Sequence, residues 1–494
     1  MTALSDRIAD VLAIDPSADV IEFEGSWRTW GQLASTAGQV AALIDRPGTE
    51  VGVVLRNRPA SIGVLLGILQ AGGCIVAINP GRGRDRTRED IAALDLPLLA
   101  GHPDDLADLR PDGARATTIA VADVGRPVVV RPGPTAAPGV GAGRPGIAVR
   151  MLTSGTTGPP KRIDLGYETF ERVLVGAKHY ESKPDAEPRE LRKGVAVVNA
   201  PLAHVGGLFR VLQCITDGRS FALLDRFTVE GWVDVVRRHR PATASLVPAA
   251  LRMVLEADLD PADLASLRSV VSGTAPLDPA DADAFFRRYR VPVLISYGAT
   301  EFGGGVAGWN IRDHREFWAT KRGSVGRAHA GCELRVVDPG SGEPLGTGAD
   351  GVLEVQAAQL AGQGWVRTTD LARIDEDGFL WILGRNDQAV IRGGFKVIPD
   401  DVRAALERHR SVRGAAVVAR PDPRLGAVPV AAVELWPGAD PVGAEELAAF
   451  IAGHLARYEL PAEIRIVDEL PRTDSGKVDL GAVTALLGEP TPEG

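Results

Sequence analysis

A polar loop at residues 153–161 has the composition of a polyphosphate-binding loop. It follows the apolar run Ile147–Val149, so we expect a strand that opens into a turn. Glycine lets backbone N–H groups turn toward an anion, hydroxyl side chains add donors, and a lysine adds a mobile positive charge. The residues that carry this hypothesis are Thr153, Ser154, Gly155, Thr156, Thr157, Gly158 and Lys161. Arg162 follows where a Walker loop has Ser or Thr, so this is a different kind of loop, and a polar surface turn is the alternative interpretation.

Other short segments carry residues that could bind a nucleotide or stabilise charge. They are Ser272, Gly273, Thr274, Ala275 and Pro276; Tyr297, Gly298, Thr300 and Glu301; Asp370; Arg385; and Lys477. Each has an ordinary explanation when taken alone: a Thr-Glu pair caps helices, an Asp after Thr suits a turn, and a loop lysine is usually solvated. His204 lies in an apolar stretch, where a satisfied core histidine is the alternative.

Composition limits the class of protein. The chain has 494 residues, of which 45% are hydrophobic and 24% charged, as in an ordinary globular protein of several units. The net charge of −9 argues against nucleic acid or an acidic membrane surface as a partner. The three cysteines, Cys74, Cys214 and Cys332, match no metal or disulfide spacing. No signal peptide or membrane span is evident, so we expect a cytoplasmic location.

Alternating helical and strand patterns must position these loops. Apolar runs at Val51–Leu55 and Cys74–Ile78 flank a helical pattern at Ala60–Ala71, and this order predicts a parallel sheet. The same pattern returns between Val195 and Ser296, with a helix at Val229–His239. In open α/β sheets, ligands lie outside the carboxyl ends of the strands. We therefore expect the polar loops to share one crevice.

The pattern changes toward the C-terminus. The Pro- and Gly-rich segment Arg126–Gly146 predicts an exposed connector without an element of its own. Short alternating runs after Gly323 predict a β-rich subdomain, and the tail from about Ala389 predicts a compact α+β module. The predicted class is thus α/β. It comprises a large N-terminal domain of stacked doubly wound sheets (1–384, β-rich part about 323–384), a hinge at 385–388, and a small mobile cap at 389–494.

The order of the motifs resembles that of the adenylate-forming superfamily, which includes acyl- and aryl-CoA synthetases, nonribosomal adenylation domains and beetle luciferase. The segments that carry the resemblance are Thr153–Lys161, Tyr297–Glu301, Thr368–Asp370, Gly384–Asp387 and Leu470–Lys477. The resemblance spans nearly the whole chain and is greatest to an acid–CoA ligase. It implies a reaction in two steps: ATP adenylates a carboxylic acid with release of pyrophosphate, and a thiol then displaces AMP.

The resemblance also implies a role for each motif in binding ATP. The 153–161 loop would hold the β- and γ-phosphates, and Tyr297 would stack on adenine beside the turn at 272–276. Asp370 would accept hydrogen bonds from the ribose hydroxyls, assisted by Arg385. ATP, Mg²⁺ and CoA are the implied cofactors.

Four residues are implied to be catalytic. Thr300 would bind the α-phosphate, and Glu301 would hold Mg²⁺, a cation that prefers carboxylate oxygen. Lys477 would stabilise the charge that develops between the acid and the α-phosphate. His204, in a segment that looks like the family's Pro-Leu-Phe-His motif, would help to position the carboxylate.

A mobile cap is implied as well, with Asp387 at its hinge. In one pose Lys477 enters the site; in the other, the loop with Gly393, Gly394 and Lys396 faces it and admits the pantetheine thiol of CoA. The sequence departs from the family pattern in places. Thr369 replaces a glycine before the ribose aspartate, Leu480 replaces a common arginine, and the connection between Val355 and Trp365 is short.

Small residues are expected to line the acyl pocket. The candidates are His204, Gly207, Val247, Ser272, Gly273, Ala299, Gly303, Gly304 and Gly305. No acidic residue lies beside His204 to pair with an α-ammonium group, and an unpaired buried ammonium is costly. We therefore expect a simple aromatic or aliphatic carboxylic acid rather than an amino acid.

Three hypotheses for the function follow. The first is an acid–CoA ligase. The second is a stand-alone adenylating enzyme that loads an acyl group onto a carrier protein, because the sequence shows no carrier domain of its own. The third is a nucleotide-binding homologue that has lost catalysis. A homodimer is left open.

Overall fold

The computed structural model describes residues 2–133, 143–153, 161–176, 190–360, 364–385, 388, 390–392, 395–422, 424–473 and 476–488. The predicted positions of several elements are close to the observed ones. The helix at Val229–His239 and the strand at Cys74–Ile78 have the bounds expected from their patterns. Other elements differ from expectation at their ends: the pattern at Ala444–Ala456 predicts one helix, and helix α13 (Ala444–Ala452) ends four residues earlier, with Gly453 as its C-cap.

The first sheet carries the 153–161 loop near one edge. Its strands are β3 (Glu50–Val54), β4 (Cys74–Ile78), β5 (Leu98–Gly101), β6 (Thr117–Ala120), β7 (Val129–Arg131), β8 (Ile147–Thr153) and β9 (Lys161–Gly166). Their order is β7-β6-β5-β3-β4-β8-β9. The five central strands are parallel, and β7 and β9 are antiparallel edges. The predicted parallel sheet is therefore present.

One expectation for this sheet was wrong. The Pro- and Gly-rich segment 126–146 contains strand β7, whose residues Val129–Arg131 pair with Thr118–Ala120 of β6. All three side chains of β7 are exposed, and Val129 has half of its surface in contact with solvent. A short edge strand that packs no side chain into the core has no hydrophobic alternation, so the sequence pattern does not reveal it.

Helices separate the first sheet from the second. Helix α3 (Pro59–Gln70) is apolar on every side and is buried from Pro59 to Leu69, as expected for a helix inside a core. One hydrophobic cluster joins its residues to both sheets. The second sheet consists of β10 (Arg192–Val198), β11 (Arg219–Leu223), β1 (Asp19–Phe23) and β2 (Ser26–Thr29), in that order.

The third sheet has the order β12-β13-β14-β15-β16. Its strands are β12 (Thr243–Ser245), β13 (Ser269–Gly273), β14 (Val293–Ala299), β15 (Gly304–Gly308) and β16 (Arg327–Ala328). Strands β12, β13 and β14 are parallel, and their amphipathic helices pack on them in a second hydrophobic cluster. The remaining helical elements of the sequence up to this point are α1 (Ala3–Ile14), α2 (Trp30–Ala41), η1 (Pro80–Arg82), α4 (Arg84–Leu94), α5 (Pro103–Leu109), α6 (Tyr167–Phe170), η2 (Glu171–Gly176), α7 (Val205–Thr216), α8 (Val229–His239), α9 (Pro248–Glu256), η3 (Pro261–Leu264), α10 (Pro279–Tyr289), η4 (Thr300–Phe302) and α11 (Ile311–Phe317).

An antiparallel meander follows, as the alternating pattern after Gly323 predicted. It is built from β17 (Cys332–Val337), β18 (Asp350–Ala357), β19 (Val366–Ile374) and β20 (Leu380–Arg385), paired in chain order. The short connection between β18 and β19 contains a single turn of helix, η5 (Ala358–Leu360).

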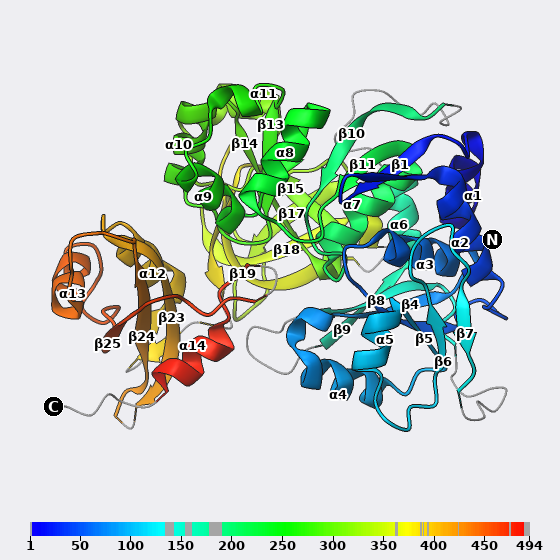
Figure 1. The fold of residues 1–494 in the computed structure, drawn as a ribbon. Coiled ribbons are helices and arrows are strands. Elements are labelled where there is room, and N and C mark those ends of the chain that lie inside the picture. Colours follow the sequence, from blue (N-terminus) through cyan, green and yellow to red (C-terminus); the bar gives the residue numbers. More distant parts are fainter. Residues whose placement is uncertain are drawn as a thin grey trace.

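The C-terminal elements form a smaller body with its own hydrophobic clusters. Its strands are β21 (Val390–Arg392), β22 (Phe395–Val397), β23 (Val412–Asp422), β24 (Gly426–Leu435) and β25 (Glu463–Val467), and its helices are α12 (Pro399–Glu407), α13 and α14 (Leu480–Leu487). Figure 1 shows this body beside the larger one formed by the preceding sheets. The predicted α/β class, with a large N-terminal part and a small α+β C-terminal part, is confirmed.

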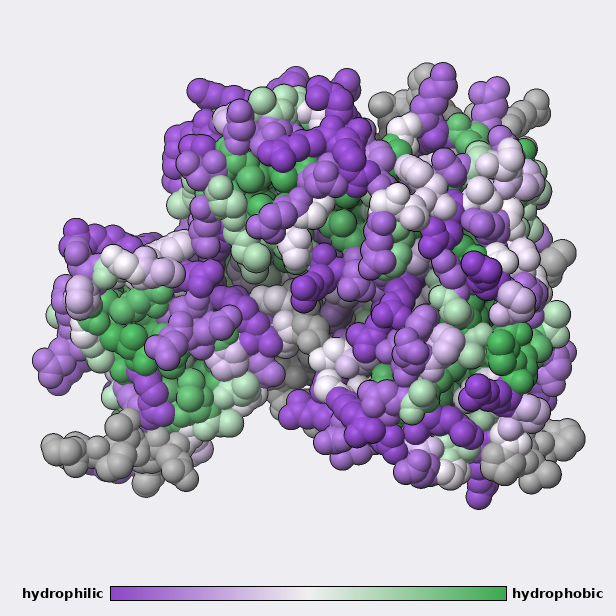
Figure 2. Space-filling model, viewed as in Figure 1, coloured by the Kyte–Doolittle hydropathy of each residue, from purple (hydrophilic) through white to green (hydrophobic). Residues whose placement is uncertain are grey.

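Hydrophilic residues cover much of the face seen in Figure 2, and hydrophobic residues appear there in separate patches. Among the described residues, no helix combines the length and apolar character needed to cross a bilayer. The long apolar stretch around residues 62–78 is instead helix α3 followed by strand β4, both buried.

Candidate functional site

Several strands end where the predicted site residues lie. Strand β8 ends at Thr153, β13 at Gly273 and β14 at Ala299, directly before Thr300 and Glu301 in η4. Thr153 pairs with Lys161 across the β8–β9 hairpin, so the loop between them is closed at its base. Ser154, Gly155, Thr156, Thr157 and Gly158 lie outside the described residues, and their predicted role stays a prediction.

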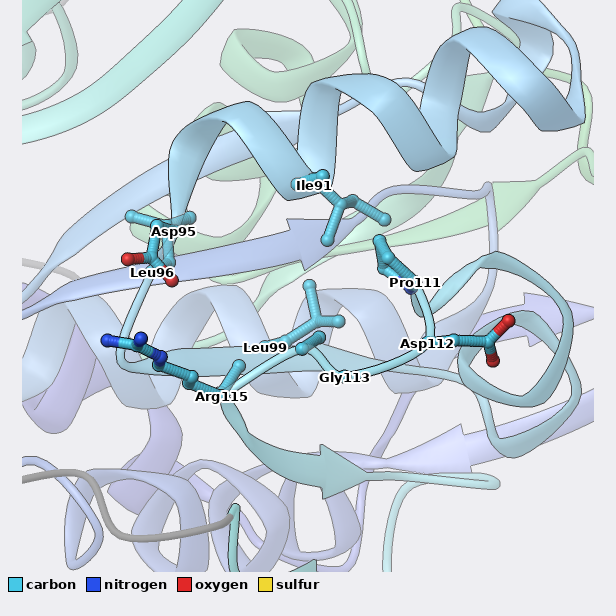
Figure 3. Close-up of a pocket in the computed structure, with 11 residues that line it drawn as sticks. Ile91, Asp95, Leu96, Leu99, Pro111, Asp112, Gly113 and Arg115 are labelled. Atoms are coloured by element: carbon cyan, nitrogen blue, oxygen red, sulfur yellow. The ribbon is translucent and has the colours of Figure 1, made fainter.

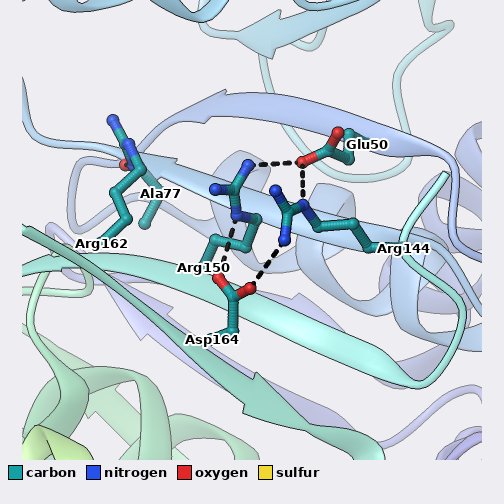
Figure 4. A network of polar contacts seen from close by, with 6 residues as sticks. All are labelled: Glu50, Ala77, Arg144, Arg150, Arg162 and Asp164. Carbon is teal, nitrogen blue, oxygen red and sulfur yellow. Dashed lines mark hydrogen bonds and ion pairs between the residues drawn. The ribbon is translucent and has the colours of Figure 1, made fainter. Parts of the chain in front are cut away.

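Arg162 anchors this hairpin to the rest of the first sheet. Its guanidinium donates to the Ala77 carbonyl oxygen (2.8 Å) and pairs with Asp90 of α4 (2.5 Å), and only 10% of the side chain is exposed. Figure 4 shows Arg162 reaching across to Ala77 at the end of β4. A paired charge at this depth fixes the strand that begins with Lys161. Apart from the contrast with a Walker loop, no pattern in the sequence indicates this role of Arg162.

A second ionic network lies near the start of the same hairpin. Arg150 on β8 pairs with Glu50 on β3 (2.6 Å) and with Asp164 on β9 (3.0 Å). Arg144 reaches the same two carboxylates, at 3.4 and 2.9 Å (Figure 4). Each carboxylate thus receives two guanidinium groups, so the three strands are cross-linked.

Tyr297, Asp370 and Arg385 come together although 88 residues of sequence separate the first from the last. The Tyr297 hydroxyl donates to the Asp370 carboxylate, and Asp370 faces Arg385 across β19 and β20. Burial raises the pKa of Tyr297, and the negative charge of Asp370 raises it further. The phenol therefore stays protonated, and it holds the carboxylate that was predicted to bind ribose.

The unusual threonine in this motif is accommodated without strain. Thr369 lies in strand β19 where the pairing with β18 shifts register, between the pairs Glu354–Arg367 and Val352–Leu371; its side chain is exposed and its φ is not positive. Its neighbour Thr368 accepts a hydrogen bond from the Asp370 amide (3.0 Å) and donates one to the Leu353 carbonyl oxygen (2.9 Å). These bonds fix the backbone at Asp370, so the missing glycine does not displace it.

Lys477 of the C-terminal body lies within electrostatic reach of residues from the N-terminal body. Burial lowers its pKa, although part of the side chain stays exposed; the positive charge of Arg385 lowers it further, and Glu301 opposes the shift. The Lys477 loop is closed by the Thr473 amide, which donates to the Lys477 carbonyl oxygen (2.7 Å). A Cβ added at Gly476 would lie 3.8 Å from Ala249 of α9, so the loop rests on the N-terminal body.

His204 is the residue immediately before helix α7, and its ring faces the same region. Burial lowers its pKa, and so does the positive charge of Lys477, so the imidazole is neutral near pH 7. Its Nε2 atom is buried and has no hydrogen-bond partner among the described residues. Ser272 Oγ, at the end of β13, is also buried and has no hydrogen-bond partner among the described residues. Buried polar atoms without a protein partner are the atoms that a bound ligand can satisfy.

The predicted nucleotide turn contains a strained residue. Thr274 has a φ of +71°, a left-handed conformation that is rare for a β-branched side chain. Ala275 and Pro276 complete the turn beside it, and Gly273 packs against β14, because an added Cβ would meet the Ser296 carbonyl oxygen at 2.7 Å. Strain of this kind is frequent at ligand-binding sites.

The predicted acyl-pocket glycines play different structural parts. Gly207 does not face open space: a Cβ there would lie 2.2 Å from the Pro201 carbonyl oxygen. The absence of a side chain therefore allows helix α7 to pack on the preceding loop, and the place of Gly207 in the pocket lining stays a prediction. Gly304, in contrast, has nothing within 4 Å of an added Cβ. Its neighbour Gly305 pairs with Gly298 of β14.

Aromatic residues border the same region and were not predicted. A Cβ at Gly303 would meet Thr169 Cγ2 at 2.4 Å and Phe209 Cζ at 4.0 Å. Phe209 stacks on Phe170 with ring centroids 4.6 Å apart. The other two candidates, Val247 and Ala299, are half-buried residues that immediately precede α9 and η4. The sequence does not predict this pair, because its pattern cannot distinguish two aromatic residues near a site from aromatic residues of the core.

The metal prediction rests on a single carboxylate. Glu301 is exposed at the end of β14, and no group of three or more His, Cys, Asp or Glu side chains among the described residues could hold a metal alone. This fits Mg²⁺, which binds one or two carboxylates and completes its shell with water and nucleotide phosphates.

Most of the cap residues expected to act in the second pose lie outside the described residues. Lys396 lies in β22, and its side chain is outside the described residues, as are Asp387, Gly393 and Gly394. Their hinge and tunnel roles stay predictions.

A separate pocket of about 300 Å³ lies at the opposite edge of the first sheet. Figure 3 shows Asp95, Leu96 and Arg115 around it, at the amino ends of β5 and β6. Ligands of parallel α/β sheets bind at the carboxyl ends. The pocket shares no residue with the predicted site.

Known proteins similar to this chain are enzymes that bind AMP. A family model described as AMP-binding enzyme matches residues 9–363, and one described as AMP-binding enzyme C-terminal domain matches residues 401–477. The chain is 30% identical to 4-coumarate–CoA ligase-like 8 of Arabidopsis thaliana, over 67% of this chain and 61% of that protein. It is 28% identical to 2-succinylbenzoate–CoA ligase of Bacillus velezensis, over 94% of both chains.

Among solved structures, the chain resembles the amide bond synthetase McbA of Marinactinospora thermotolerans. The TM-score is 0.78 and the sequence identity 26%, and the match covers 98% of this chain and 100% of that one. Both the large body and the smaller C-terminal body therefore have counterparts in a known enzyme.

Proposed function

Because the chain belongs to the AMP-binding enzyme family, we propose that it is an ATP-dependent carboxylic acid–CoA ligase. Membership confirms the superfamily expected from the motifs. The AMP-forming acid–thiol ligase class is the activity proposed within it. In the proposed reaction a carboxylate oxygen attacks the α-phosphorus of ATP, giving an acyl-adenylate and pyrophosphate. The thiol of CoA then attacks the acyl carbon, and AMP leaves.

The observation that carries the proposal is the place of Lys477. A lysine near the C-terminus lies within electrostatic reach of Glu301, Arg385 and His204, three residues from different segments of the N-terminal body. Adenylation joins two anions, a carboxylate and a polyphosphate, so cations held at the junction lower the barrier most. An arrangement with Lys477 and Arg385 on one side and a neutral histidine on the other suits that step.

In this proposal each residue holds or orients a reactant. Asp370, supported by Tyr297, accepts from the ribose hydroxyls, and Thr300 donates to the α-phosphate. In its Nε2-protonated tautomer, His204 donates to the acid carboxylate, which satisfies a nitrogen that is buried without a protein partner. Mg²⁺ beside Glu301 would supply charge neutralisation for the phosphates. Fixing both reactants in line removes much of the entropic cost of the reaction.

We propose an aromatic acid as the substrate class. Phe209, which is half-buried and stacks on the fully buried Phe170, offers an apolar aromatic surface near Gly303, and an added Cβ at the nearby Gly304 would meet nothing within 4 Å. The names of the plant and Bacillus relatives also refer to aromatic acids, 4-coumarate and 2-succinylbenzoate. A planar ring packed against Phe209 would bury apolar area with little loss of conformational entropy.

The acceptor is proposed to be the thiol of CoA, delivered after the cap turns. Residues 385–388 would then act as the hinge, and the loop with Gly393 and Gly394 would line the thiol path. The amide bond synthetase among the structural neighbours makes an amine acceptor the specific competitor.

The test is an end-product assay with purified protein, ATP and Mg²⁺. The acids are 4-coumarate, 2-succinylbenzoate and, as an aliphatic control, octanoate, each with CoA, with an amine or with hydroxylamine. We expect AMP and an aromatic acyl-CoA by mass spectrometry. A hydroxamate without acyl-CoA would favour a carrier-protein acceptor, and an amide would favour an amine. No pyrophosphate exchange across the panel, with ATP still bound, would favour the inactive homologue.

A further inference from the structure

Asn57 links the first sheet to the loop that carries His204. It lies after strand β3, and only 4% of its surface is exposed. Its amide nitrogen donates to the carbonyl oxygens of Ala200 (3.1 Å) and Leu224 (2.9 Å), and its amide oxygen accepts from the Leu202 amide (2.8 Å). All three partners lie at the carboxyl ends of the second sheet, more than 140 residues away in sequence.

Only a side-chain amide has the donors and the acceptor that these contacts need. An aspartate of the same shape would place a carboxylate against two carbonyl oxygens and could donate to neither. An alanine would leave two carbonyl groups and one N–H group at this depth without their side-chain partner. The residue type at position 57 therefore matches the arrangement of backbone groups that it meets.

The loop bound by Asn57 is stiffly coupled to His204. The His204 amide donates to the Pro201 carbonyl oxygen (3.0 Å), and the Leu208 amide donates to the His204 carbonyl oxygen (3.1 Å), so the loop leads directly into helix α7. Gly207 lets the first turn of that helix press on Pro201 and Ala200. A shift of the Ala200–Leu202 backbone would therefore move His204 with it.

We propose that Asn57 is a positioning residue that sets the place of the His204 imidazole and thereby the capture of the acid carboxylate. This inference rests on the proposed function for its kinetic consequence, but not for its structural one. The contacts of Asn57 are with backbone groups of the loop, whereas the His204 ring has a buried, unpartnered Nε2 and lies within electrostatic reach of Lys477. Asn57 touches no reactant and acts only through the loop.

The structural test follows His204 by NMR in protein with ¹³C-labelled histidine. The resonance is assigned by its loss in His204→Gln. The variants are Asn57→Ala and Asn57→Ser, with Ser5→Ala as the matched control, since Ser5 Oγ makes a buried bond to the Leu69 carbonyl oxygen (2.7 Å) in another part of the protein. We expect the pKa of His204 to rise toward its ordinary value in both Asn57 variants and to stay unchanged in Ser5→Ala. A His204 pKa unchanged in an Asn57 variant that folds, as checked by circular dichroism, overturns the proposal.

The kinetic test uses pyrophosphate exchange with 4-coumarate as the acid. A misplacement of about 1 Å can cost on the order of 100-fold in rate, so we expect Asn57→Ala to raise the KM for 4-coumarate at least ~10-fold while the KM for ATP changes less than ~2-fold. In a His204→Ala background, the same substitution should add little, because the two residues act as one unit. Equal rises in both KM values, or effects that multiply in the double variant, contradict the proposal. A wild-type protein that catalyses no exchange with any acid contradicts the proposed function instead, and the NMR result still decides the role of Asn57.

Discussion

Replacing Gly207 by alanine should displace the His204 loop. The added Cβ would lie 2.2 Å from the Pro201 carbonyl oxygen, 2.5 Å from its carbon and 2.7 Å from the Ala200 carbonyl oxygen. An ordinary contact between such atoms is longer by about 1 Å, and all three atoms are backbone, so no rotamer change can relieve the clash. Overpacking of this kind costs about 1–3 kcal/mol of unfolding free energy. If the loop yields by the missing distance, the rate of acid activation falls by up to ~100-fold.

Helix α7 supplies a control for this prediction. Gly206 is exposed, and an added Cβ there has nothing within 4 Å. Gly206→Ala should keep full activity and gain stability, because alanine favours a helix over glycine by about 1 kcal/mol. Urea unfolding gives both free energies, and pyrophosphate exchange gives both rates. Equal behaviour of the two variants, or normal stability and activity of Gly207→Ala, would refute the packing argument.

The remaining predictions concern charge. Lys477→Ala should lower the rate of adenylation by about 100- to 1,000-fold, the typical effect of removing one charge-stabilising donor. It should leave the rate of thioester formation from a supplied acyl-adenylate nearly unchanged. Single-turnover assays measure each step, and an equal loss in both steps would contradict a cap with two poses. Arg162→Met should lower the unfolding free energy by about 3 kcal/mol, because it leaves the half-buried Asp90 without its partner. The same variant should raise the KM for ATP. Asp90→Asn keeps a hydrogen-bond acceptor for Arg162, so it should lower the unfolding free energy by less. The lowered pKa of His204 means that the unfolded chain binds its proton first as pH falls, so stability should decline below about pH 6.5. Urea unfolding at pH 7.5 and 5.5 should show a smaller decline in His204→Gln, and the same decline in both proteins would count against the assignment.

Much of the site could be predicted because its signals are local. Gly273, Ala299 and Thr300 were placed at strand ends because apolar runs stop there and small or polar residues follow. Tyr297, Asp370 and Arg385 were grouped through the order of their motifs, and the structure brings these three side chains together. Local pattern failed at β7, which contributes no side chain to the core.

Positioning residues escaped the sequence analysis for a common physical reason. Asn57 and Arg162 bind backbone carbonyl oxygens, which every residue has, so nothing in the partner's sequence marks the contact. The packing of Gly207 against the Pro201 backbone could not be predicted either, because a glycine that makes room for a ligand and a glycine that makes room for backbone are the same residue type in the sequence. Only three-dimensional packing distinguishes them.

By itself the sequence determined the class of fold, the approximate bounds of most helices and strands, and the residue types available for nucleotide chemistry, since those follow from short-range periodicity and turn chemistry. The tertiary structure decided which of these residues meet. It brought Lys477 of the C-terminal body within electrostatic reach of Glu301 and Arg385, and bound the His204 loop to Asn57, which follows a strand far earlier in the chain. Such pairings depend on how whole sheets and helices pack against one another. They arise from many long-range contacts, so no single segment of the sequence predicts them.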